Sequence, residues 1–350
     1  MTPFSVPTVT LKHSYSVSLI AFLLLLLALI CGISIGETNI AFNTVLKSLA
    51  NKLFNASYAI NTIDQGIIWN YRLTRTLVAA CCGAALAVTG LVLQSLLRNS
   101  LADPYLLGIS AGASTGAVMV TIAGVGVGVL TLSAGALIGA ILAFTFVVIL
   151  AVLASGNRMG NLSTQIILAG IAGSQLFNAL TAFVIAKSAN AEQARGIMFW
   201  LLGNLSGVRW PEVSLAIPTL LIGLLVIIWH GRSLDAFLFG SDAAASIGIP
   251  VKRVQTLLIF STAMMTAVMV SMVGAIGFVG LVIPHAARFL VGTKHLALIP
   301  TCAITGAVFL VICDIGSRIV IPGQVLPIGV VTALIGAPCF AIVLIRGQRK

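Results

Sequence analysis

Charge is scarce in this chain. Only 8% of its 350 residues are Asp, Glu, Lys or Arg, and its eight acids form no paired-carboxylate pattern. Hydrophobic residues make up 59% of the chain, and the mean hydropathy is +1.14. A soluble domain does not have this composition, whereas membrane helices do, and they also accept the 34 glycines freely. The sequence therefore predicts a polytopic membrane protein.

The residue patterns of common catalytic and metal sites are also missing. The six cysteines lie in or beside apolar runs without a CxxC pair, and the four histidines lack the spacing of metal ligands. No P-loop, HExxH or Ser-His-Asp arrangement is recognisable. We interpret the cysteines as apolar packing residues. The sequence predicts no catalytic residue, no bound metal and no cofactor, which argues against an intramembrane enzyme.

Apolar runs long enough to cross a bilayer core of ~30 Å, about 20 residues each as a helix, recur along the chain. We predict about ten spans, at 16–36, 73–96, 105–125, 129–154, 163–186, 211–230, 254–273, 276–291, 296–316 and 325–345. The net charge of +11 comes from basic residues placed sparsely between these runs, which favours membrane flanks over a nucleic-acid surface. With an internal N-terminus, 11 basic residues are inside and 8 outside, so both termini are predicted to be cytoplasmic.

One polar segment with several glycines, residues 232–253, interrupts the apolar pattern. Ser241 is predicted to cap a short helix there, and Asp242 suits the positive end of its dipole. Gly248 is predicted to end this helix, and Pro250 prevents its continuation. A structured loop between two spans indicates a docking element for a soluble partner, and an ordinary solvated loop is the alternative.

Small residues are spaced for close helix packing. Gly108, Gly112 and Gly116 recur every four residues and are predicted to lie on one face of the third span. Gly135 and Gly139 do the same in the fourth. Such faces let helix backbones approach closely, so we expect a tightly packed bundle.

A few polar residues fall inside the spans. Ser174, Gln175 and Asn178 lie near the middle of the fifth span, and Gln94 and Asn99 mark the cytoplasmic end of the second. These groups either line a water-filled translocation pathway or form hydrogen bonds between helices. The sequence leaves both interpretations open.

Five motifs resemble those of a known family. They are the run RLTRTLVAACCGAALAVTGLVLQSLLRNSLADPYLLGISAGAS (72–114), LAGIAGSQ (168–175), FGSDAAASIGI (239–249), GAIGFVGLVIPHAARF (274–289), and DIGSR with LPIGVVTALIGAPCF (314–318 and 326–340). In this order they resemble the FecCD family, the membrane permeases of bacterial ABC importers for ferric siderophores, haem and cobalamin. The resemblance runs from about residue 16 to 346, and the loop at about 37–68 carries no recognisable signature.

This resemblance implies an all-α integral membrane protein with the type II ABC importer permease fold, in which residues 1–350 form a single permease domain. It implies a multi-pass protein of the bacterial cytoplasmic (inner) membrane, surrounded by lipid. The implied partners are a second permease subunit, identical or paralogous, two ATP-binding subunits that hold ATP and Mg, and an extracytoplasmic substrate-binding protein. This chain would not hydrolyse ATP itself.

The resemblance also gives the 232–253 loop the role of coupling to the ATP-binding subunit. Gly240, Ala244 and Gly248 match small positions of the family, and their spacing of four predicts one helix face without bulk that enters a groove of the partner. Ser241 and Asp242 belong to the same predicted coupling site.

Three arginines are predicted on the outer side. Arg72 and Arg75 share a helix face at the start of the second span, and Arg318 ends the ninth, one turn after Asp314. By resemblance, they form a cationic rim that accepts glutamates of the binding protein. The alternative is that they extend to lipid headgroups. Asp314 is expected to orient or pair with Arg318.

The resemblance implies a permease subunit that moves a bulky iron-siderophore complex inward. Haem and cobalamin are the alternatives within the family. A channel or an ion-coupled carrier is the rival from another class, but it needs no large coupling segment, and a proton-driven carrier should have acids in the middle of its spans.

Overall fold

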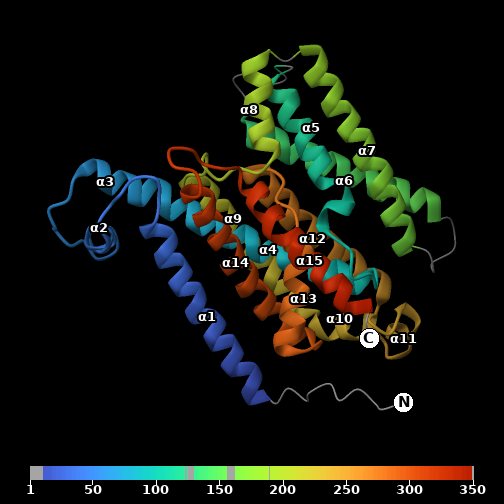
Figure 1. Cartoon of the computed structure of the whole chain (residues 1–350). Coiled ribbons are helices and arrows are strands. Elements are labelled where there is room, and N and C mark those ends of the chain that lie inside the picture. The colour runs from blue at the N-terminus through green and yellow to red at the C-terminus, as the bar shows by residue number, and fades with distance from the viewer. Residues whose placement is uncertain (1–10, 123, 125–129, 156–161, 189, 349–350) are drawn as a thin grey trace.

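The structure is a computed structural model that describes residues 11–122, 124, 130–155, 162–188 and 190–348, and these residues form helices and no strands (Figure 1). The elements are α1 (Leu11–Ser34), α2 (Phe42–Phe54), α3 (Thr62–Gly66), the π-helical η1 (Ile67–Leu73), α4 (Thr74–Leu96), the short 3-10 turn η2 (Pro104–Leu107), α5 (Ile109–Thr121), α6 (Leu132–Ser155), α7 (Leu162–Ser188), α8 (Ala191–Leu201), α9 (Trp210–Trp229), α10 (Gly231–Phe237), α11 (Ser241–Ser246), α12 (Val251–Val273), α13 (Val279–Val291), α14 (His295–Ile319) and α15 (Ile328–Gln348).

The predicted all-α fold is confirmed, and each of the ten predicted spans coincides with an apolar helix. Among the described residues, six helices are long and apolar enough to cross a membrane, and four shorter apolar segments accompany them. The third and eighth spans are shorter than predicted, because α5 begins only at Ile109 and α13 only at Val279. The stretch without a signature, residues 37–68, contains α2 and α3.

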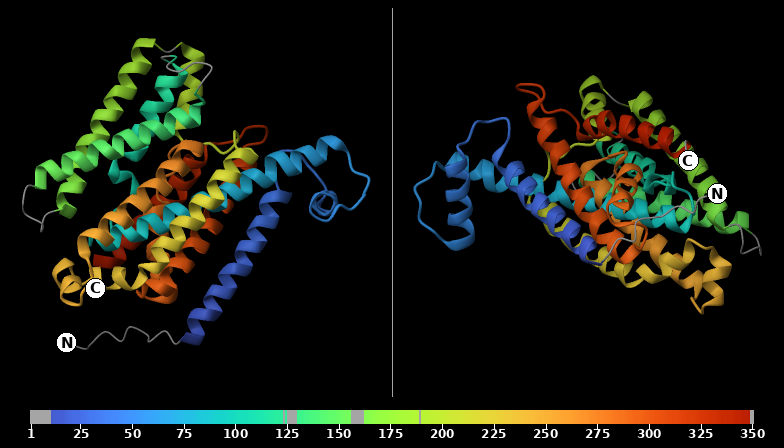
Figure 2. Two further views of the ribbon diagram at one scale, coloured as in Figure 1. Left: turned by 180° about the vertical axis from the view of Figure 1, so that it is seen from behind. Right: turned by 60° about the horizontal axis from the view of Figure 1, so that its bottom comes forward.

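Helix α4 is the centre of the bundle. It is buried along almost its whole length and contacts α14, α13, α12 and α9 (Figures 1 and 2). Helices α5, α6 and α7 pack on one another as a second group, which meets the first through α12. The apolar faces of both groups form the core, as expected for helices that exclude lipid by close packing.

Glycines set the distance between several of these helices. A Cβ atom at Gly112 would lie 2.3 Å from the carbonyl oxygen of Gly139, and one at Gly116 would lie 2.0 Å from that of Gly135. The predicted glycine faces of the third and fourth spans therefore do meet. Gly108 is an exception: it precedes α5 with a left-handed backbone (φ 75°) and does not belong to the helix face.

We expect Gly116→Ala to destabilise the chain by about 1–3 kcal/mol, because the added methyl group forces α5 away from α6. Gly196→Ala in α8 is the matched control, since a Cβ atom there meets nothing within 4 Å. Thermal unfolding of both variants in detergent measures the difference. Equal midpoints for the two variants would contradict this account of the α5–α6 contact.

The bundle has two distinct ends. Helices α10 and α11 lie at one end, where α1 begins and α15 ends, whereas α2 and α3 lie beyond the other end of α1 (Figures 1 and 2). The polar 232–253 segment and the three arginines singled out in the sequence are thus at opposite ends of the molecule.

Candidate functional site

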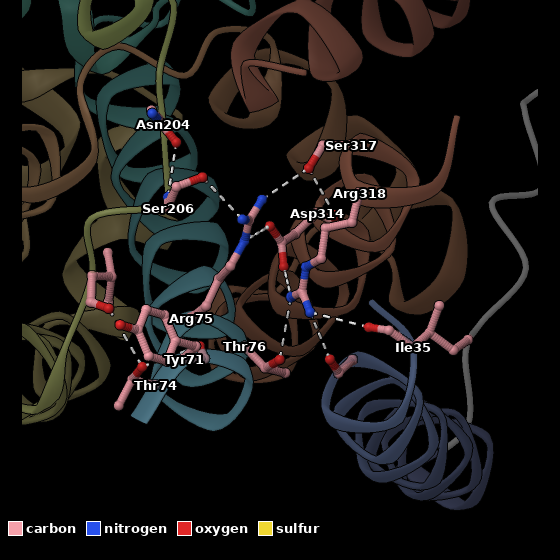
Figure 3. Close-up of polar contacts among 12 residues, drawn as sticks. Ile35, Tyr71, Thr74, Arg75, Thr76, Asn204, Ser206, Asp314, Ser317 and Arg318 are labelled. Atoms are coloured by element: carbon pink, nitrogen blue, oxygen red, sulfur yellow. Dashed lines mark hydrogen bonds and ion pairs between the residues drawn. The ribbon is translucent and has the colours of Figure 1, made fainter. Parts of the chain in front are cut away.

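A buried carboxylate holds two of the three arginines together (Figure 3). Asp314 on α14 is fully buried, and its Oδ1 accepts a hydrogen bond from Arg75 Nε at 2.7 Å. Its Oδ2 contacts Nη2 of Arg318, one turn later on the same helix. Ser206 Oγ and Ser317 Oγ each lie 3.1 Å from the remaining nitrogens of Arg75. The expectation that Asp314 pairs with Arg318 is confirmed, and Arg75 joins the pair.

The arginines also hold the C-terminal end of α1. Arg318 Nη1 donates to the carbonyl oxygens of Gly32 at 2.8 Å and Ile35 at 3.2 Å. Arg72, in the π-helical segment η1, donates from Nη1 to the carbonyl oxygen of Ser34 at 2.6 Å and from Nη2 to Thr38. The last carbonyls of a helix lack partners within it and carry its negative dipole end, so cationic donors stabilise them.

The predicted open rim is therefore a buried cluster. Arg72, Arg75 and Arg318 are only 4–8% exposed, and their partners lie within the chain. The sequence predicted their common end of the molecule correctly but not their burial. The three side chains still line an open cavity of about 400 Å³, together with Glu37 and Val325 among others. Their role in docking a binding protein stays a prediction.

At the opposite end, the polar segment folds as α10 and α11. Gly240, not Ser241, is the N-cap of α11, and Asp242 lies in its first turn as predicted. Gly248 follows the helix with a left-handed backbone (φ 86°) and donates to the carbonyl oxygen of Ala245 at 2.9 Å, while Ile249 N donates to Ala244 at 3.1 Å. This pair of bonds is a Schellman motif, which ends the helix as Gly248 was predicted to do.

The explanation offered for the small residues of this segment is wrong. Gly240 and Gly248 flank α11 and do not share a helix face with Ala244, and Ala244 is fully buried against the bundle. The two glycines are favoured because both have positive φ, at 108° and 86°. The exposed surface of this segment consists of other residues, since Phe239 is 80% and Ile247 70% exposed.

A chain of three side chains ties α10 to the core. Asp235 Oδ1 accepts from the backbone N of His295 at 3.0 Å and from its ring Nδ1 at 2.7 Å. Nε2 of the same ring lies 2.7 Å from Ser95 Oγ on α4. No Ser-His-Asp arrangement was recognisable in the sequence, because the fold joins these residues from three distant segments. Ser95 and His295 are both buried, and the arrangement links residues 232–253, the predicted coupling segment, to α4 and α14.

Comparisons with known proteins identify the family of this chain. The model of the FecCD transport family matches residues 24–346. The chain belongs to the FecCD transport family. It is 37% identical over 342 residues to the uncharacterized ABC transporter permease protein YvrB of Bacillus subtilis, covering 97% of this chain and 96% of YvrB.

Two further relatives of this FecCD chain carry a substrate in their names. The cobalamin import system permease BtuC of Halobacterium salinarum is 38% identical over 82% of this chain and 75% of its own length. The vitamin B12 import system permease BtuC of Salmonella typhi is 36% identical over 93% and 94%. An inward-facing structure described as a metal-chelate type ABC transporter superposes with a TM-score of 0.80 and 27% identity, covering 95% of this chain and 99% of that one.

Membership of this family makes the chain a membrane permease of an ABC importer and not a catalytic subunit. The type II importer fold and the multi-pass character predicted from the sequence are confirmed.

The residues predicted to line a pathway in this FecCD permease fall into two groups. Gln94 is 3% exposed, donates to the carbonyl oxygen of Gly280 at 3.0 Å and accepts from Arg288 at 2.8 Å. Asn99 accepts from Leu101 N at 2.9 Å in the turn after α4. Gln94 therefore forms hydrogen bonds between helices, as the alternative interpretation expects, whereas the bond of Asn99 lies within its own turn. On α7, Gln175 and Asn178 are exposed and Ser174 is half-buried, so these residues remain candidates for a pathway.

Proposed function

We propose that this FecCD permease is the translocation subunit of a binding-protein-dependent importer that carries a bulky metal chelate into the cytoplasm. The observation that carries the proposal is the separation of two specialised ends on one helical bundle. An arginine-lined cavity lies at one end, and a structured segment with exposed apolar side chains lies at the other. ATP and Mg belong to two separate ATP-binding subunits in this scheme, and a second permease subunit completes the pathway.

Two cargo classes are candidates. Cobalamin is favoured by the names of two relatives that are 36–38% identical. An iron-siderophore is favoured by the metal-chelate description of the structure with the TM-score of 0.80. Both cargoes are large organic metal complexes, so the same pathway architecture suits either.

The cargo is tested by uptake. The permease, expressed with its cognate ATP-binding subunits and binding protein in cells that lack their own FecCD permeases, is supplied with radiolabelled cobalamin or with a radiolabelled ferric siderophore. Accumulation of one compound assigns the cargo. Accumulation of neither, with the complex assembled in the membrane, would contradict import of these two classes.

The arginine-lined cavity is proposed to receive carboxylates of the binding protein. Charge reversal of the arginines does not test this, because Arg75→Glu places a carboxylate beside the buried Asp314 and disturbs the fold. Filling the cavity from Val325 leaves the arginine network intact. We expect Val325→Trp to weaken binding-protein affinity at least tenfold.

Gln324→Trp is the matched control, since Gln324 is exposed, adjacent in sequence and does not line the cavity. Affinities are measured in nanodiscs at low salt, where charge contacts are least screened. Equal affinity for Val325→Trp and Gln324→Trp would remove the cavity from the docking site.

Both termini are proposed to be cytoplasmic. The beginning of α1 and the end of α15 lie at the same end of the bundle as the coupling segment (Figure 1). A cysteine that replaces Lys350, in a chain whose exposed Cys339 is changed to Ser, should resist an impermeant thiol reagent applied to spheroplasts and react in inside-out vesicles. Labelling in spheroplasts would reverse the orientation and with it the side on which the ATP-binding subunits act.

A further inference from the structure

A second cavity, of about 270 Å³, lies at the coupling end of the bundle and is separate from the arginine-lined cavity of the other end. Its lining includes Arg98, just after α4, Arg288 on α13, and the buried residues Gln94, Ser95 and His295. The cavity borders the link between α10 and α11, because Leu238 also lines it.

The charges at this cavity are unbalanced. No lining residue is acidic, and within the described ranges neither Arg98 nor Arg288 forms an ion pair. Arg288 Nη1 instead donates to Gln94 Oε1 at 2.8 Å, which fixes the guanidinium at the edge of the cavity. Two guanidinium groups without an acidic partner line one cavity, which favours an anion there.

The turn at the end of α4 sets the position of Arg98. Arg98 has φ 47°, a left-handed conformation that residues other than glycine seldom adopt. Its guanidinium lies close to Gly240, where a Cβ atom would come within 3.4 Å of Nη1. The left-handed residue Arg98 ends α4, because Asn99 N donates to the carbonyl oxygen of Gln94 at 3.1 Å, and the turn places the Arg98 side chain at the cavity.

The buried residues of the lining form a fixed set of polar groups. His295 is held by Asp235 on one side of its ring and contacts Ser95 on the other. The Asp235 carboxylate therefore sits behind the imidazole and not in the lining of the cavity. Ser100 and Thr293 add hydroxyls to the lining. These contacts hold the buried part of the lining in place, so a ligand meets the guanidinium groups and the exposed hydroxyls of Ser100 and Thr293.

We propose that this cavity binds a phosphate group, supplied either by inorganic phosphate or by the headgroup of an anionic phospholipid. Phosphate presents more acceptor oxygens than a carboxylate and matches the two guanidinium groups and the hydroxyls that surround the space. Basic pockets at the ends of transmembrane helices bind anionic headgroups in the same way. Phe289 and Leu290, next to Arg288 on α13, are exposed and suited to acyl chains.

The experiment uses the full chain in nanodiscs of phosphatidylcholine. One arm measures binding of radiolabelled inorganic phosphate, and the other measures retention of phosphatidylglycerol by native mass spectrometry. Each charge-assisted contact that is lost should weaken binding about tenfold, so we expect that decrease for Arg98→Gln and for Arg288→Gln. Arg232→Gln is the control, because Arg232 is exposed on α10 and does not line the cavity.

The arms distinguish the two sources. Saturable retention of phosphatidylglycerol without phosphate binding assigns the site to a lipid headgroup, and saturable phosphate binding assigns it to the free ion. Because Arg98 is exposed, its substitution tests the site even if Arg288→Gln fails to fold. No saturable binding in either arm, or equal binding by wild type and Arg98→Gln, overturns the proposal. If neither arm detects binding and Arg98→Gln lowers the affinity for the ATP-binding subunit, the cavity is assigned to a carboxylate of that subunit. This result also overturns the proposal.

Discussion

Replacing Asp314 by Asn should destabilise the chain by about 3–5 kcal/mol, the largest effect expected of any single change of charge in this protein. The substitution keeps the shape of the side chain but removes its charge. Arg75 and Arg318 would then be buried cations without a counterion, and the contacts of Arg318 with the end of α1 would be weakened as well. Denaturant unfolding in detergent measures the change.

Glu192→Gln is the control for Asp314→Asn. Glu192 is exposed in the first turn of α8 and makes no ion pair among the described residues, so its loss should cost at most about 1 kcal/mol. A variant in which Asp314 and Arg75 are both replaced by apolar residues of similar size should recover part of the stability. If Asp314→Asn unfolds at the same denaturant concentration as wild type, the cluster does not hold the helices together.

Replacing Phe239 by Glu should abolish productive association with the ATP-binding subunits. Phe239 is 80% exposed in the link between α10 and α11, so the change leaves the fold intact but places a charge where we propose that an apolar side chain enters the partner. Aromatic anchors of this kind commonly contribute at least 2 kcal/mol, which corresponds to about a thirtyfold loss of affinity. Co-purification measures the association with the ATP-binding subunits, and ATP hydrolysis by the assembled complex measures whether it is productive.

Phe54→Glu is the matched control for this prediction. Phe54 is 81% exposed but lies at the end of α2, at the opposite end of the molecule. Its substitution should leave the ATP-binding subunits attached. Equal assembly of the two variants would mean that the partner does not contact Phe239.

The apolar pattern predicted the bundle because helices in lipid need a long apolar stretch, and such a stretch is visible locally. The ten spans and the glycine faces of α5 and α6 follow from spacing within one segment, and the common end of the three arginines follows from the number of spans between them. The ion pair between Arg75 and Asp314 joins residues 239 positions apart, so no local pattern indicated that the arginines are buried.

In the coupling segment, a local pattern was visible but was interpreted wrongly. A spacing of four between Gly240, Ala244 and Gly248 was interpreted as a helix face, although α11 contains only Ala244 of the three. The two glycines are needed for backbone conformations with positive φ, and the spacing of residues does not reveal such conformations. The Asp235, His295 and Ser95 contacts were missed because they come from three helices that meet only in the folded chain.

Helix α2 could have been found. The sequence FNTVLKSLANKLF places Phe42, Leu46, Leu49 and Leu53 along one face, with Val45 on the side that packs against the chain. The surrounding stretch carried no family motif, so its periodicity was overlooked. A helical pattern of 13 residues was sufficient to predict this element from the residues alone.

The most direct test of the central claim is the energy requirement of transport. The permease is reconstituted in proteoliposomes with its ATP-binding subunits and cargo-loaded binding protein, and cargo accumulation is followed with ATP, without ATP, and with ATP-binding subunits whose catalytic Glu is replaced by Gln. This account predicts accumulation with ATP and wild-type ATP-binding subunits only, and its loss in Phe239→Glu. Accumulation by the permease alone, driven by an ion gradient or by the cargo gradient, would contradict it and identify the chain as a carrier or a channel.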